Sequence, residues 1–375
     1  GGLVGFACTD GLYVGDRRIV NRDCSGPRSA RALLGNRGID VAVVETARGG
    51  ILREGLGFDR CHAAVVTNIG EGDHLTLRGI DTLEELARVK RTVVEAVAPD
   101  GVAVLNAADP LVAAMAAHCP GRVIFFARDA DHPIVTGHRQ RGERAIFVRG
   151  SEIVLAEGER EEVLTSLERV PLTHNGRVGF QVENVLAACA AVWSLNLPLD
   201  TLRAGLASFI GDARQVPGRF NVFRAGEVTV IVDYAHNPSA LTALVASLTA
   251  FPHRRRCLVF TPSNRRDEDV TAMGRIIGDG FDRVLLYHDE GNSDRADGEL
   301  NVLLRRGIAA GQRHPDVSET RGELAAIEAA LADLQPGDLL VLGVEAIEEA
   351  LAFVASRLEG RSVPSCSGSP GNASE

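Results

Sequence analysis

The chain has 375 residues, of which 45% are hydrophobic and 24% are charged, and its formal net charge at pH 7 is −10. This length and composition predict a packed protein of two or three domains. The negative charge argues against a general surface for nucleic acids or anionic membranes, and the aromatic content of 5% argues against stacking platforms for single strands.

The seven cysteines are scattered along the chain and form no C-x-x-C pair. They indicate neither a disulfide framework nor a zinc knuckle, and a reducing cytoplasm is the compartment that we expect. No apolar run is long enough to span a bilayer, and no secretory signal is visible. The chain opens on glycine rather than methionine, so Gly1 is not expected to be the natural start.

Residues 1–39 are rich in glycine and are predicted to be loop-like. Turn signals stand at Thr9-Asp10-Gly11 and at Asp23-Cys24-Ser25-Gly26-Pro27. Thr9 and Asp10 could also serve a ligand, but a plain turn is the favoured interpretation.

Two short apolar runs, residues 40–45 and 63–68, are typical of strands buried on both faces of a parallel sheet, and the residues between them are predicted to be a polar loop. Ligands of open α/β sheets bind beyond the carboxyl ends of the strands. Glu45 and Asn68 end these runs and His74 follows, so we expect the three at one edge of one sheet. Glu45 and His74 could share Mg²⁺, although a buried, hydrogen-bonded histidine is favoured by the sequence alone.

A helix is predicted from Asp81 or Thr82, either of which can cap it, to the breaker Pro99-Asp100-Gly101. Lys90 lies within this helix, where a lysine is usually a solvated surface residue. Residues 102–106 are expected to form the next strand, and Asp109 is expected to cap the helix that begins at Pro110.

The alternation of strands and helices predicts a parallel sheet built from βαβ units. Small antiparallel strands are expected between residues 132 and 172, and helices from Phe180 and Leu199. Residues 211–219 are predicted to be an interdomain hinge, and the last residues, from Ser362, a disordered tail. Between them a second, smaller α/β domain is predicted. Its strands are expected at residues 228–233, 256–261, 283–287 and 339–343. Helices are expected to begin at 238 and at 267, two more to lie between 287 and 339, and a last one to end at about 358.

Two polar stretches follow strands of this second domain. Asp233-Tyr234-Ala235-His236-Asn237-Pro238 opens a helix, whose N-terminus attracts anions, and Asp233 could accept a hydrogen bond from a ribose. A simple capping turn explains this stretch equally well. The arginines of Asn264–Asp269 are plausible phosphate ligands, but a solvated run of charges is the favoured interpretation.

Taken together, these segments resemble the Mur ligase superfamily, and within it the Mur-ligase-like half of the cyanophycin synthetases. The resemblance covers nearly the whole chain up to about residue 358, and E-T-A-R-G-G-I-L-R-E-G-L-G is its most particular motif. The matching segments are E-T-A-R-G-G-I-L-R-E-G-L-G-F-D (45–59), T-N-I-G-E-G-D-H-L (67–75), A-R-V-K (87–90), L-N-A-A-D-P (105–110), Q-V-E-N-V-L-A-A (181–188), P-G-R-F (217–220), V-D-Y-A-H-N-P (232–238) and N-R-R-D-E-D (264–269).

The resemblance implies a fold and an activity. It implies a central parallel-sheet domain over residues 1–216, a Rossmann-like C-terminal domain over 217–360 and a tail over 361–375. The family joins acids to amines by forming an acyl phosphate with ATP and Mg²⁺. The relatives in question add arginine to the side-chain carboxyls of a poly-aspartate backbone, so ATP, an amino acid and a poly-aspartate or peptide acceptor are the implied partners, with a homo-oligomer possible.

The resemblance also implies site residues by position. Glu45 and His74 match magnesium ligands, and Lys90 matches a lysine that many members carbamylate into a further, carboxylate-like ligand; these three are the implied catalytic and metal residues. Asn68 matches a residue beside the phosphates. The residues that match the rest of the nucleotide site are Asn184, Arg219, Asp233, His236 and Asn237.

One element of the family is missing from the sequence. A P-loop, G-x-x-x-x-G-K-[ST], should precede the first motif, and no such motif occurs in the chain. We therefore expect a portion of a longer enzyme, a truncated product or a degenerate paralogue. The alternatives to the leading function are a ligase for another peptide or folate substrate, and a non-catalytic relative that binds a polymer, peptide or nucleotide.

Overall fold

The computed structural model describes residues 2–70, 79–262, 265–288 and 298–359. His74 and the predicted disordered tail lie outside these ranges. The chain forms two compact units, Gly1–Ile210 and Gly211–Glu375, and each is described by itself.

The first unit begins with a four-stranded sheet in the order β3-β2-β1-β4. Its strands are β1 (Val4–Cys8), β2 (Gly11–Val14), β3 (Arg17–Val20) and β4 (Val41–Val44). Helix α1 (Pro27–Leu34) lies between β3 and β4 in the chain. The prediction that residues 1–39 are loop-like was wrong, although Thr9 and Asp10 do form the turn between β1 and β2. The strands are only four or five residues long, and β1 is also held by parallel pairing with the distant β4.

One face of this sheet is open. Leu33 of α1 packs with Ala7 and Ala42 on the inner face. On the outer face Val41 and Val43 are 40% and 50% exposed, and the prediction that this strand is buried on both faces was wrong. Among the described residues, no helix covers the outer face of β4, which explains the exposure.

A six-stranded sheet follows, in the order β10-β9-β8-β7-β6-β5. Its strands are β5 (Cys61–Val66), β6 (Val97–Asn106), β7 (Arg122–Ala127), β8 (Arg144–Arg149), β9 (Glu152–Glu157) and β10 (Arg160–Ser166). Strands β5 to β8 are parallel and β8 to β10 antiparallel, as the sequence predicts. Since β4 and β5 belong to different sheets, the expectation that their ends lie on one sheet was wrong.

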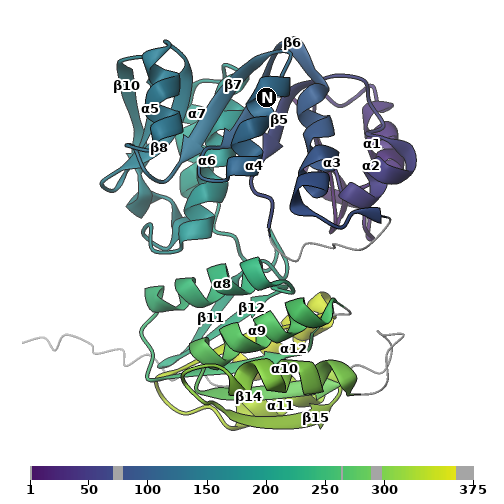
Figure 1. Ribbon diagram of the computed structural model, residues 1–375, viewed down its shortest axis with the longest axis vertical. Helices are drawn as coiled ribbons and strands as arrows, with labels where there is room; N and C mark the ends of the chain where they lie inside the picture. The colour runs from purple at the N-terminus through teal and green to yellow at the C-terminus, as the bar shows by residue number, and fades with distance from the viewer. Residues whose placement is uncertain (1, 71–78, 263–264, 289–297, 360–375) are drawn as a thin grey trace, which may run out of the picture. The chain divides into compact units, whose positions relative to one another are not determined.

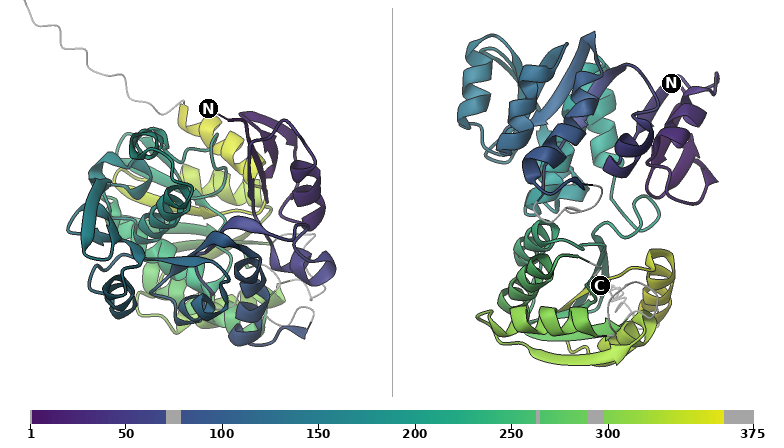
Figure 2. Two further views of the ribbon diagram at one scale, coloured as in Figure 1. Left: turned by 90° about the horizontal axis from the view of Figure 1, so that it is seen from above. Right: turned by 45° about the vertical axis from the view of Figure 1, so that its right-hand side comes forward.

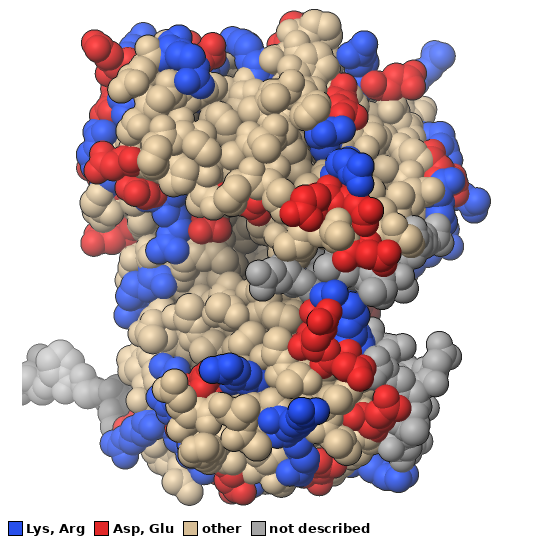
Figure 3. Space-filling view, in the orientation of Figure 1, with Lys and Arg blue, Asp and Glu red and all other residues tan. Residues whose placement is uncertain are grey.

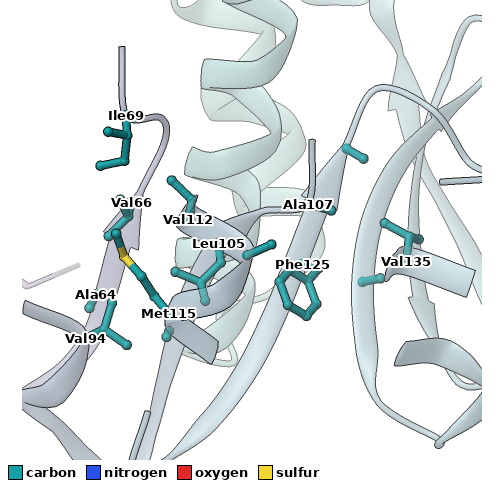
Figure 4. Close-up of a cluster of buried hydrophobic side chains, with 14 of the residues drawn as sticks. Ala64, Val66, Ile69, Val94, Leu105, Ala107, Val112, Met115, Phe125 and Val135 are labelled. Carbon is teal, nitrogen blue, oxygen red and sulfur yellow. The ribbon is translucent and has the colours of Figure 1, made fainter. Parts of the chain in front are cut away.

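Helices cover both faces of the six-stranded sheet (Figures 1 and 2). Side chains of α3, α4 and α5 pack on one face in a cluster that includes Val94, Val112 and Val135 (Figure 4). The opposite face packs against α6 and α7, through residues such as Leu186 and Leu202. These helices are α3 (Leu83–Glu95), α4 (Pro110–Ala113), α5 (Pro133–Gln140), α6 (Gly179–Ser194) and α7 (Leu199–Ser208).

Local capping explains where two of these helices start. The Thr82 side chain accepts from the backbone N–H of Glu85, whose side chain accepts in return, which forms a capping box at α3. Asp109 caps α4 with Pro110 in its first turn, as predicted. The predicted end of α3 at Pro99 was wrong, because Val97 already pairs with Cys61 as the first residue of β6.

Two further helices of the first unit were not predicted. The loop expected after Glu45 contains α2 (Arg48–Glu54), and α5 lies where only antiparallel strands were expected. Helix α2 contains two glycines, and α5 contains three successive β-branched residues and a glycine, so both have weak intrinsic helix propensity.

The second unit is a six-stranded sheet in the order β11-β12-β16-β13-β14-β15. Its elements are β11 (Asn221–Ala225), β12 (Val228–Asp233), α8 (Pro238–Ser247), β13 (Arg255–Phe260), α9 (Asp267–Gly280), β14 (Arg283–His288), α10 (Glu299–Ala309), β15 (Asp316–Arg321), α11 (Glu323–Ala332), β16 (Asp338–Gly343) and α12 (Ile347–Glu359). Helices α11 and α12 pack on one face, through side chains such as Ile327 and Val354. The edge strands β11 and β15 were not predicted, because both are half-exposed and carry charged residues.

The face drawn in Figure 3 mixes both signs of charge. None of the helices formed by the described residues is long and apolar enough to cross a membrane. The six cysteines of the described ranges are free, as the sequence predicts; the seventh, Cys366, lies outside them.

Candidate functional site

Glu45 follows β4 and is held there by the turn after β1. The Thr9 backbone N–H and hydroxyl each donate to one oxygen of the Glu45 carboxylate, both at 2.7 Å. The Glu45 backbone N–H donates to Ala7, which continues the pairing of β1 with β4. Two hydrogen bonds fix the orientation of this exposed carboxylate and leave further lone pairs on both oxygens.

Asn68 is exposed at the end of β5, where the next residue is anchored by the β6–α4 turn. The Ile69 backbone N–H donates to Asp109 at 2.6 Å, and the other oxygen of the Asp109 carboxylate caps α4. The Asn68 amide lies 3.5 Å from the Thr67 hydroxyl. Asp109 therefore both caps α4 and fixes the backbone of the residue that follows Asn68.

Lys90 is half-buried on α3 and is the sole lysine of the chain; the other members of its 40 Lys and Arg residues are arginines. A lysine amine can lose its proton and react as a nucleophile, whereas an arginine stays protonated. Position 90 is thus the one place where a side-chain amine is present.

The ligand chemistry for a hard cation is present in part. The Glu45 carboxylate offers oxygens, which Mg²⁺ prefers, and its orientation is already fixed by Thr9. The described residues contain no group of three His, Cys, Asp or Glu side chains arranged around a common point, and His74 lies outside them.

Asn184 is exposed on the first turns of α6. Its side-chain amide donates to the Gln181 carbonyl oxygen at 3.2 Å, and Gln181 is itself buried. Burial raises the pKa of the neighbouring Glu183, and the Arg128 guanidinium partly lowers it again. The start of α6 therefore combines an oriented amide with a carboxyl group that holds its proton more firmly than usual.

In the second unit, Asp233 ends β12 opposite Gly343 of β16. Burial raises the pKa of Asp233 to about 6, although the backbone N–H groups of Phe220 and Ala235 and the Arg219 guanidinium each lower it. These two N–H groups orient the carboxylate.

Arg219 lies on the loop that enters β11, and this loop is fixed by the buried side chain of Asn221. The Asn221 amide donates to the carbonyl oxygens of Gly211 and Val216, and its own carbonyl accepts the Gly218 N–H at 2.7 Å. The Asn221 side chain thus ties the stretch predicted to be a hinge together at Gly211, Val216 and Gly218.

His236 and Asn237 complete this end of β12. The Asn237 side chain accepts the Ala240 N–H at 2.8 Å and caps α8, and the His236 Nδ1 lies 2.7 Å from the Tyr234 carbonyl oxygen. Since that oxygen can only accept, His236 Nδ1 carries a proton. Arg219, Asp233, His236 and Asn237 are therefore brought together by the structure.

The first unit matches the model of the Mur ligase middle domain over residues 6–192, and the second matches the Mur ligase glutamate ligase domain over residues 218–343. The cyanophycin synthetase of Crocosphaera subtropica is 38% identical over 357 residues, which are 95% of this chain and 41% of that protein. The chain belongs to the Mur ligase family. It spans about 40% of the length of the cyanophycin synthetases it matches.

More distant relatives agree with this assignment. The UDP-N-acetylmuramoyl-L-alanyl-D-glutamate–2,6-diaminopimelate ligase of Gloeobacter violaceus is 29% identical, over 83% of this chain and 59% of that one. The solved structure of Escherichia coli FolC in complex with DHPP and ADP has a TM-score of 0.64 and 19% identity, over 96% of this chain and 83% of that one. The Mur ligase fold predicted from the sequence is confirmed.

Three contacts of this Mur ligase chain were missed by the sequence analysis: Thr9 with Glu45, the Tyr234 ring with Arg219, and the anchoring of the loop by Asn221. Each contact joins residues that are distant in the chain or in a turn of irregular shape. Of these residues, Thr9 was noted in the sequence as one that could serve a ligand, but a plain turn was the favoured interpretation.

The raised pKa of Asp233 predicts a pH-dependent cost to stability. The folded protein holds this proton up to about pH 6, whereas an unfolded chain loses it near pH 4. As the pH rises from about 4 to 6, the free energy of unfolding should therefore fall by up to about 3 kcal/mol relative to an Asp233→Asn variant and stay level above that window. Urea titrations of both proteins at pH 4, 5, 6 and 7 measure this difference, and a constant difference would contradict the prediction.

Proposed function

We propose that this chain is the arginine-adding module of an enzyme of the cyanophycin synthetase type, an ATP-dependent acid–amino acid ligase. It would join arginine to the aspartate side-chain carboxyls of a poly-aspartate backbone. The observation that carries the proposal is the 38% identity to a cyanophycin synthetase over 95% of this chain, across both units.

The reaction proceeds in two balanced steps. A carboxylate oxygen of the acceptor attacks the γ-phosphorus of ATP, and ADP leaves. The amine of the incoming amino acid then attacks the acyl carbon, the acyl–oxygen bond breaks, and phosphate departs as the amine loses a proton. Both steps crowd negative oxygens together, which requires cations at the transferring phosphoryl group.

In the first unit, Glu45 would bind Mg²⁺ together with His74 and with Lys90 as its carbamate. The ion, when bound, would neutralise negative charge on the phosphate oxygens. The two hydrogen bonds from Thr9 already orient the Glu45 carboxylate for this role. Asn68, exposed at the end of β5, would donate its amide N–H to a phosphate oxygen.

The family resemblance supports further nucleotide roles for Asn184 of α6 and for residues at the end of β12. Asn184, at the start of α6, would donate its side-chain amide N–H to the nucleotide. Arg219 would pair with a phosphate group, since a guanidinium can form two parallel hydrogen bonds to phosphate oxygens. Asp233 would accept from a ribose hydroxyl, while His236 and Asn237 shape the adjoining turn.

The proposal is tested by amide-bond formation. With Mg²⁺-ATP and a poly-aspartate peptide, the chain extended upstream through a phosphate-binding loop is expected to add arginine residues, detected as the mass of the peptide increases. The same assay with lysine, glutamate and diaminopimelate is the control for the incoming amino acid. Binding of ATP or peptide without any mass increase would support the non-catalytic alternative instead.

Because Lys90 is the sole lysine of the chain, one substitution tests its proposed role as a carbamate ligand. Lys90→Arg keeps the positive charge but cannot form a carbamate, so it is expected to abolish arginine addition. Arg88→Lys, on an exposed position of the same helix, is the matched control and is expected to leave the rate unchanged. Full activity of Lys90→Arg would exclude a carbamate ligand.

A further inference from the structure

The Tyr234 side chain lies among the groups gathered at the end of β12, where it contacts both a cation and an imidazole. The guanidinium carbon of Arg219 lies 5.6 Å from the centre of its ring, which is within the range of a cation–π interaction. The centre of the His236 ring lies 4.4 Å from the same point, with the two planes inclined at 48°.

The backbone on both sides of this ring is fixed. The Tyr234 N–H donates to the Gly218 carbonyl oxygen at 3.0 Å, which joins the end of β12 to the residue before Arg219. His236 Nδ1 donates to the Tyr234 carbonyl oxygen at 2.7 Å. The backbone that carries the ring is therefore fixed beside the residue that precedes Arg219.

Charged groups also act on the Tyr234 phenol. Burial and then the Glu345 carboxylate raise the pKa of the Tyr234 phenol, while Arg265 and Arg219 lower it. Glu345 is itself held in place, since its backbone N–H donates to Glu323 at 2.6 Å.

An arginine side chain has many rotamers, and ordering it on binding costs free energy. A ring that already holds the guanidinium in one orientation removes part of this cost. We infer that Tyr234 is a positioning residue that holds the Arg219 guanidinium ready for a nucleotide phosphate. The inference rests on the proposed nucleotide role of Arg219.

Substitution of Tyr234 tests this in the extended chain with Mg²⁺-ATP. Tyr234→Leu removes the ring and is expected to raise the KM for ATP roughly tenfold while kcat changes little, because Arg219 would contribute binding that is equal in the ground and transition states. Tyr234→Phe keeps the ring and is expected to behave like the parent protein. Equal losses in both variants would point to the hydroxyl and overturn the inference.

A double-mutant cycle separates this inference from the proposed function. In an Arg219→Ala background, Tyr234→Leu should have no further effect on the KM for ATP. If Arg219→Ala alone leaves the KM unchanged, the proposed nucleotide role of Arg219 fails. If Arg219→Ala raises the KM and Tyr234→Leu does not, or if the two effects simply add, Tyr234 does not act through Arg219.

A second readout needs no turnover. In the chain Gly1–Glu375, the rate at which phenylglyoxal modifies Arg219 can be followed by peptide mass spectrometry, with the exposed Arg306 as internal reference. Tyr234→Leu is expected to raise the Arg219 rate severalfold, and Tyr234→Phe to leave it unchanged, at equal thermal midpoints. An unchanged rate in Tyr234→Leu would overturn the inference.

Discussion

The chain Gly1–Glu375 by itself is expected to release phosphate from ATP at least about a thousandfold more slowly than the same chain extended upstream through a phosphate-binding loop. A P-loop surrounds the β- and γ-phosphates with backbone N–H groups and a lysine. Each charge-assisted hydrogen bond of this kind contributes roughly 1.5–3 kcal/mol. The loss of two or three of them weakens the stabilisation of ATP by several kcal/mol, and about 4 kcal/mol corresponds to a thousandfold.

The first unit has a place for such a segment. Within the described residues, β4 pairs only with β1 and β5 pairs only with β6, so each has an unpaired edge. A strand that pairs in parallel with β4 would end beside Glu45, and a loop that follows such a strand would begin near the proposed metal ligand.

The measurement is phosphate release with Mg²⁺, arginine and an aspartate polymer, for the short and the extended chain side by side. An extended chain in which the lysine of the phosphate-binding loop is replaced by alanine is the control for folding, because it restores the strand without the cation. Robust arginine-dependent turnover by the short chain would refute the prediction and would mean that another loop holds the phosphates.

Local signals predicted much of the fold. The capping residues Thr82 and Asp109 fixed helix starts correctly, and the apolar run 228–233 followed by Asn237-Pro238 predicted β12 and α8. Strands β1, β2 and β3 were missed because they are only four or five residues long, and because β1 also depends on pairing with the distant β4; β11 and β15 were missed because both are partly exposed and carry charged residues.

The candidate site could be predicted from local signals only in part. The residue types at strand ends pointed to a ligand edge, but the roles of Glu45, Lys90 and Arg219 came from the family resemblance. The contacts that orient these side chains, such as Thr9 with Glu45, depend on how separate turns meet in space. Periodicity and propensity carry no information on such meetings, so the structure was needed to find them.

Gly307→Ala is expected to destabilise the second unit by about 3 kcal/mol, a large share of the stability of an ordinary domain. Helices α9 and α10 approach so closely that an added Cβ at Gly307 would lie 2.1 Å from the Thr271 carbonyl oxygen and 2.8 Å from the Gly274 Cα. At Gly274 it would lie 2.2 Å from the Leu304 carbonyl oxygen. These neighbours are backbone atoms, so the helices can only accommodate the methyl group by moving apart.

The usual effect of this substitution in a helix is the opposite. Alanine is favoured over glycine by about 1 kcal/mol in a helix interior. Gly205→Ala, on the exposed side of α7 with no atom within 4 Å of its added Cβ, is the matched control and is expected to stabilise the protein by about 0.5–1 kcal/mol. The difference in sign between the two variants isolates the packing of α9 against α10.

Hydrogen exchange of the α9 and α10 amides, with urea unfolding followed by circular dichroism, measures the loss in the second unit. Trp193 is the sole tryptophan and lies in the first unit, so its fluorescence should report an unchanged transition in Gly307→Ala. Gly307→Ala combined with Gly274→Ala should cost less than the sum of the single variants, because one separation of the helices accommodates both methyl groups. Exchange rates equal to those of the parent protein in Gly307→Ala would show that the two helices are not held at this distance.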